Sequence, residues 1–70
     1  MANTYTAILQ QEDDWWVGWI EEIPGVNAQE KTRGELLESL KVILEEALEF
    51  NRQDARDAAS GDFVEEVVSV

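Results

Sequence analysis

One stretch of this chain has the spacing of an amphipathic helix, and its position limits the folds available. Apolar residues recur at intervals of three and four from Leu36 to Leu48, with charged residues between them. The segment Thr32–Glu35 that precedes them has the Thr-x-x-Glu pattern of a capping box. We therefore predict a helix that begins after Thr32, with a polar, alanine-rich continuation that Gly61 could end.

The segments before and after this helix alternate as strands do. We predict strands over residues 4–11, 15–22, 26–31 and 63–70, with a hairpin loop at Gln11–Asp14 and a type II turn at Ile23–Gly25. The predicted order is β-β-β-α-β, which is an α+β fold of two layers with one helix on one face of a mostly antiparallel sheet. With 70 residues, the chain is expected to form a single domain, 1–70.

Three tryptophans lie within five residues of the second predicted strand. Alternation places Trp15, Val17 and Trp19 on one face of that strand, and Trp16, Gly18 and Ile20 on the other. One helix covers one face only, so either Trp16 or the other two rings lie away from it. The rings could simply pack across strands, or at least one could anchor an interface, where Trp is enriched.

The composition excludes several kinds of chemistry. The chain has no Cys and no His, which excludes disulfides, cysteine-based metal sites and a histidine general base. No apolar run is long enough for a membrane span, and residues 1–4 do not resemble a secretory leader, so we expect a cytoplasmic protein. A chain this small buries little surface alone. We therefore expect a homodimer or a tetramer.

The charge is strongly acidic, because 5 basic and 16 acidic residues give a net charge of −11. Such a charge opposes binding to nucleic acid or to an anionic membrane and favours a basic protein partner, although it could serve solubility alone. The acidic run Glu12–Asp14 raises the question of calcium, but its spacing does not match an EF-hand loop. We interpret it as a solvated turn and expect no metal and no cofactor.

Several features, in this order along the chain, resemble the HicB-type antitoxin family of type II toxin–antitoxin systems. They are Tyr5, residues 12–16, Ile23-Pro24-Gly25, Ala28-Gln29, residues 32–35 and Leu36-Leu37. The similarity covers about Tyr5 to Leu48. Two departures stand out: Leu36-Leu37 is more apolar than is usual in the family, and no DNA-binding domain follows, so we expect no direct binding of nucleic acid.

The resemblance implies a partial RNase H-like fold and a protein that masks a small basic RNA-cleaving toxin of the HicA type. Two alternatives stay open: a dimerising or scaffold module of the same fold without a toxin, and a hydrolase with RNase H chemistry. We expect no enzyme activity, because the carboxylates are scattered along the chain. The predicted partner-binding residues, placed along one edge and the exposed sheet face, are Glu12, Asp13, Asp14, Trp16, Glu21, Glu22 and Glu30.

Overall fold

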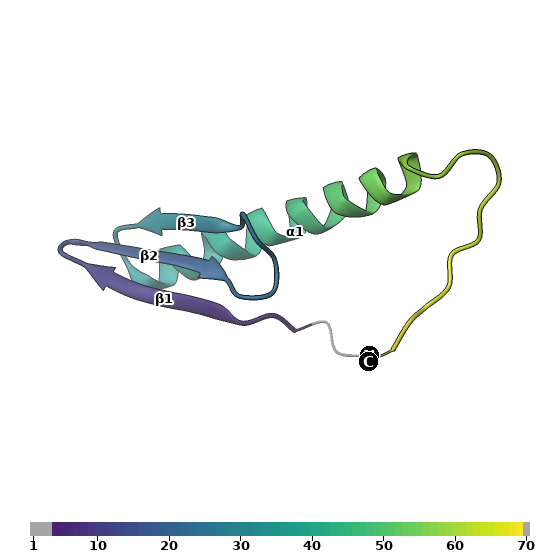
Figure 1. The fold of residues 1–70 in the computed structure, drawn as a ribbon. Coiled ribbons are helices and arrows are strands. Elements are labelled where there is room, and N and C mark those ends of the chain that lie inside the picture. The colour runs from purple at the N-terminus through teal and green to yellow at the C-terminus, as the bar shows by residue number, and fades with distance from the viewer. Residues whose placement is uncertain (1–3, 70) are drawn as a thin grey trace.

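The computed structural model describes residues 4–69 and shows three strands followed by one helix (Figure 1). The elements are β1 (Ala7–Glu12), β2 (Trp15–Ile20), β3 (Asn27–Glu30) and α1 (Arg33–Asp57). The strands form one antiparallel sheet in the order β1-β2-β3, and α1 packs across one face of it. The α+β arrangement of two layers predicted from the sequence is confirmed to this extent.

The hairpin between β1 and β2 is tighter than predicted. Glu12 pairs with Trp15, so the loop contains only Asp13 and Asp14. Asp13 adopts a left-handed backbone conformation with φ of 54°, which two-residue hairpins commonly need. Between β2 and β3, Gly25 has a φ of 88°, which is the positive value that the third position of a type II turn requires.

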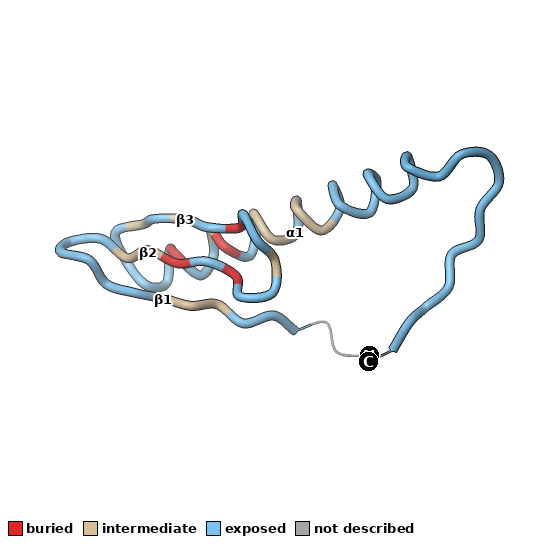
Figure 2. The backbone as a smooth tube through the Cα atoms, viewed as in Figure 1, coloured by how far each residue is buried: buried red, intermediate tan, exposed pale blue. Residues whose placement is uncertain are grey.

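The buried core lies where α1 crosses the sheet. It consists of Ile20, Val26, Leu36 and Leu40, shown red in Figure 2. Gly18 lies directly beneath the helix, because a Cβ added there would be 3.0 Å from Leu36 Cδ2. The close approach of α1 at Gly18 shows that Trp16, Gly18 and Ile20 form the helix-facing side of β2.

The capping residue Thr32 starts α1 as the sequence predicts. Its Oγ1 accepts the N–H of Glu35 at 3.2 Å, which satisfies one of the free amides of the first turn. The return bond differs from a capping box, since the Thr32 hydroxyl itself donates to Glu35 Oε1 at 2.9 Å. This pair fixes the point at which the chain leaves β3 and enters the helix.

The molecule is elongated, because α1 extends well beyond the sheet (Figure 1). Its radius of gyration is 15.3 Å, against roughly 11 Å for a compact chain of this length. The 25 residues of α1 span about 37 Å, and the sheet is too short to cover all of them. The last turns of the helix therefore have no layer packed against them.

The fourth strand predicted over residues 63–70 is wrong for the residues that the structure describes. Residues 63–69 form no strand, and all of them are exposed. They curve back from the far end of α1 and stay clear of the sheet (Figure 1), and they are tied to α1 by the ion pair of Arg56 Nε with Glu65 Oε1 at 3.1 Å. A strand needs an edge to pair with, and this segment meets none here. Val70, the last residue of the predicted strand, and residues 1–3, over which no secretory leader is expected, lie outside the described residues.

Candidate protein-binding surface

The side of the sheet opposite α1, here called the outer face, has no layer packed on it within residues 4–69. Its centre consists of Ile8, Trp15, Val17 and Trp19, which alternation and strand register bring together. Ile8 pairs with Trp19 across β1 and β2. Because the helix covers the other side, this apolar face is open to a partner.

The two indoles of the outer face are only partly covered by their neighbours. Trp15 is 38% exposed and Trp19 is 41% exposed, which are large fractions for such bulky side chains. The ammonium nitrogen of Lys31 lies 4.4 Å from the centroid of the Trp15 ring, a cation–π contact. Trp19 has no such contact within the described part of the chain and is the more open aromatic anchor.

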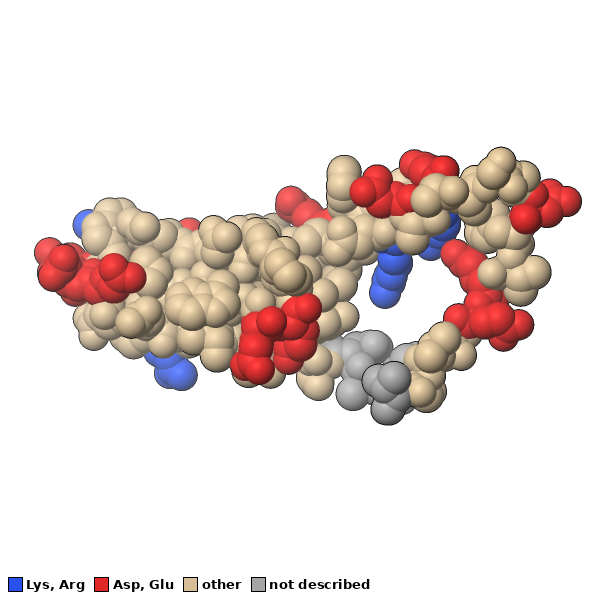
Figure 3. Space-filling model, in the orientation of Figure 1, with Lys and Arg blue, Asp and Glu red and all other residues tan. Residues whose placement is uncertain are grey.

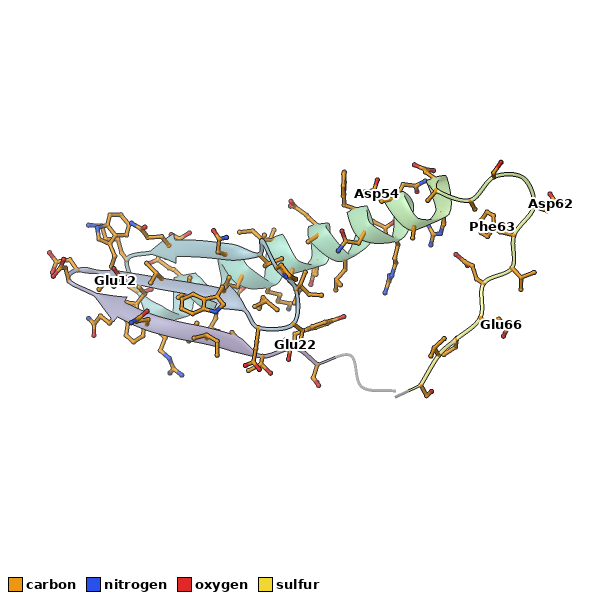
Figure 4. The ribbon with its side chains drawn as sticks, in the orientation of Figure 1. Glu12, Glu22, Asp54, Asp62, Phe63 and Glu66 are labelled. Carbon is orange, nitrogen blue, oxygen red and sulfur yellow. The ribbon has the colours of Figure 1, made fainter. Side chains whose placement is uncertain are left out.

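Acidic side chains gather at both ends of the outer face. Glu12 ends β1, Asp13 and Asp14 form the β1–β2 turn, and Glu21 and Glu22 follow the end of β2. Figure 4 labels Glu12 and Glu22 at these two ends, and Figure 3 shows red clusters on either side of an uncharged surface over the strands. The apolar centre is therefore bordered by negative charge at each end.

Glu22 is held in place by the backbone of the strand beside it. The amide of Thr6 donates to Glu22 Oε1 at 2.8 Å. This hydrogen bond favours the ionised carboxylate and lowers the pKa of Glu22 from its usual value of 4.5. Glu22 therefore presents its charge in a fixed direction, and it also ties the start of β1 to the end of β2.

Two of the predicted partner-binding residues do not lie on the outer face. Trp16 lies on the opposite side of β2 and packs against the core, so its expected place on the exposed sheet face is wrong. Glu30 is half-buried, and its Oε2 accepts a hydrogen bond from Ser39 Oγ of α1 at 2.7 Å. The remaining five do not share one edge of the sheet but divide between its two ends.

Sequence reasoning left open the side on which the tryptophans lie and so omitted Trp15 and Trp19 from the predicted site. The signal was Gly18, which shares a face with Trp16. A glycine within a strand often marks a close approach by a neighbouring element, and here that element is α1. Trp15 and Trp19, which lie on the other face of the strand from Gly18, must then point outward.

The described residues include no group of three carboxylates placed to hold a metal ion. That part of the chain also contains no helix long and apolar enough to cross a membrane. The outer face can bind by apolar contact at its centre and by charge at its ends.

Comparisons with family models, with curated proteins and with solved structures find no match to this chain. The resemblance to HicB-type antitoxins therefore stays a prediction that depends on the residues given above.

Proposed function

We propose that this chain is a binding protein without catalytic activity that covers a cationic surface on a protein partner. The partner that the sequence resemblance suggests is a small basic RNA-cleaving toxin of the HicA type. The observation that carries the proposal is the outer face, on which two half-exposed indoles lie between two acidic clusters. This combination suits a surface that is apolar at its centre and rich in Lys and Arg around it.

The acidic ends would act mainly on the rate of encounter. An enzyme that grips RNA presents basic side chains to phosphates, and carboxylates can occupy the same positions. With a net charge of −11, the chain attracts such a surface at distances up to a Debye length, about 10 Å at 0.1 M salt. Association should therefore slow markedly as salt is added.

The indoles would act mainly on the lifetime of the complex. Trp is enriched among residues whose truncation costs about 2 kcal/mol or more of binding energy. The Lys31–Trp15 contact shows that a cation can sit against an indole of this face. A Lys or Arg from a partner could contact Trp19 in the same way, and such a contact strengthens as the site is desolvated.

The test is co-expression and pull-down with the product of the adjacent reading frame, followed by titration calorimetry at two salt concentrations. Trp19→Ala should weaken binding by about 30-fold, the equivalent of ~2 kcal/mol. Phe50→Ala is the matched control, because Phe50 is also an exposed aromatic but lies on α1, away from the outer face. Absence of a complex at low salt, or equal affinity for both variants, would contradict the proposal.

A second candidate function is a dimerising or scaffold module without a toxin partner. The observation that favours it is the exposed apolar surface outside the sheet, on Phe63, Val64, Val67 and Val68. An adjacent reading frame that encodes no small basic protein would favour this alternative.

A further inference from the structure

The two flanks of α1 differ in charge. Ser39 marks the flank next to β3, because its hydroxyl bonds Glu30 of that strand. With 3.6 residues per turn, the same flank carries the acidic residues Glu35, Glu46, Glu49 and Asp57, together with the uncharged Val42, Phe50 and Gln53. The opposite flank, next to β1, carries mainly leucines and basic residues: Arg33, Leu37, Lys41, Leu44, Leu48 and Arg52, with Glu45 at its solvent margin.

The leucines on the β1 flank are not fully covered. The helix packs mainly against β3 and β2 and only slightly against β1. Leu37 is 43% exposed as a result, and Leu44 and Leu48 are only half-buried. On its other side β1 pairs with no strand among the residues that the structure describes, so this edge presents free backbone groups. We call the space bounded by this edge of β1 and this flank of α1 the open corner.

Residues 63–69, here called the C-terminal segment, have the composition that the open corner needs. Val64 is 81% exposed and Val68 78% exposed, and both are β-branched residues with high strand propensity. The segment also carries Glu65 and Glu66, which are complementary in charge to the basic flank. Glu65 already contacts Arg56 in the last turns of α1. The segment contains no proline, so every residue can donate a backbone hydrogen bond.

We propose that two copies of this chain form a dimer in which the C-terminal segment of each occupies the open corner of the other. There it adds a strand along β1, with Val64 and Val68 on the leucines and Glu66, on the same face of the strand, near Lys41 and the arginines. The seven residues match the six residues of β1 in length. The acidic flank of α1 would repel the same segment, which fixes the side on which it docks.

A second copy suits this geometry because α1 carries the segment away from its own sheet. From Leu48 to Asp57 the helix rises about 14 Å, and Figure 1 shows these turns clear of the strands. Reciprocal exchange buries each segment and each corner once. At on the order of 100 Å² for each apolar side chain, the two corners together bury roughly 1,000 Å², which is about the least that a specific interface needs.

Cross-linking can test the exchange directly, because the chain has no cysteine of its own. Ser69→Cys labels the segment, and Gln10→Cys labels the middle of β1 at an exposed position. The two single variants are mixed at micromolar concentration and treated with a short bismaleimide. Exchange predicts a covalent dimer of twice 8.0 kDa that joins residue 69 to residue 10. Glu46→Cys, on the acidic flank, is the matched control, and it should form far less cross-linked dimer with Ser69→Cys than Gln10→Cys does.

Two results would overturn the proposal. One is a cross-link that forms only within a variant carrying both cysteines, which would mean that the segment folds onto its own β1. The other is sedimentation of the unmodified chain at 8.0 kDa throughout the micromolar range.

A charge exchange gives an independent measure of the same contact. Lys41→Glu should weaken the dimer about five-fold or more, because it places like charges together in the corner. Adding Glu66→Lys to that variant should restore much of the lost dimer affinity. Adding Glu46→Lys instead should not restore it. Absence of rescue by Glu66→Lys would contradict the assignment of the corner. Neither measurement involves the toxin partner.

Discussion

Replacing Gly18 by alanine tests whether α1 really covers the side of the sheet that places Trp15 and Trp19 outward. A Cβ at this position would lie 2.8 Å from the carbonyl oxygen of Ile8, which belongs to the backbone of the paired strand. Carbon and carbonyl oxygen normally approach to about 3.3 Å, so the strands would have to separate by roughly half an ångström. The new methyl would also meet Leu36 Cδ2 at 3.0 Å, and Leu36 is fully buried and has no space to move into.

Overpacking of this kind costs about 1–3 kcal/mol. A chain of 70 residues has a total stability of about 4–10 kcal/mol, so the loss is a large fraction of it. We expect Gly18→Ala to lower the free energy of unfolding by that amount and the melting temperature by at least ~4 °C. Urea unfolding followed by tryptophan fluorescence, with circular dichroism during heating, measures both quantities.

Gly34→Ala is the matched control, because a Cβ at Gly34 meets nothing within 4 Å and lies in the first turn of α1. Alanine is the better helix former, so this variant should be as stable as the original chain or up to ~1 kcal/mol more stable. If Gly18→Ala proves as stable as Gly34→Ala, the helix does not approach β2 at this point. The assignment of the two tryptophans to the outer face would then lose its support.

Two further predictions concern the ends of the sheet. Asp13→Gly should stabilise the chain by up to ~1 kcal/mol relative to Asp14→Gly, as measured by urea unfolding. Both variants remove one charge, but of the two positions only Asp13 has a positive φ, which glycine adopts more easily. Equal stability of the two variants would contradict a strained turn. Glu22→Gln should lose a stabilising contribution that is complete above pH 4.5 and disappears as the pH falls through the lowered pKa of Glu22. The measurement is the free energy of unfolding against pH for this variant and for the Glu21→Gln control, together with an NMR titration of Glu22. A loss of stability in Glu22→Gln that does not change with pH would refute the prediction.

The parts of the fold that depend on neighbouring residues could be predicted from the sequence. The Thr32–Glu35 cap, the three strands before the helix and the glycine turn at Gly25 all depend on residues close in the chain. The fourth strand could not be predicted, since alternation and β-branched residues show what a segment favours but not whether an edge is within reach. Strand formation over residues 63–69 depends on pairing with a segment distant in the sequence, which the local pattern does not reveal.

The candidate site was harder to predict because both faces of β2 carry tryptophan. Alternation alone gives two equivalent solutions, and only the packing of Leu36 against Gly18 separates them. Glu30 shows a second limit, because nothing in its sequence neighbourhood distinguishes it from the exposed carboxylates. Its hydrogen bond to Ser39 depends on how β3 and α1 are stacked.

The five basic residues of the chain connect the two proposals. Lys31 lies on Trp15 and Arg56 pairs with Glu65, while the other three lie on the β1 flank of α1. The outer face and the open corner therefore differ in charge. The outer face lies on the side of the sheet away from α1, whereas the corner lies between α1 and the free edge of β1, so a dimer joined by its C-terminal segments would leave both outer faces free. Two outer faces would raise the avidity for a partner that is itself paired, without any new contact. Lys41→Glu should then lower the avidity for a dimeric partner but leave unchanged the affinity of one outer face for a monomeric partner.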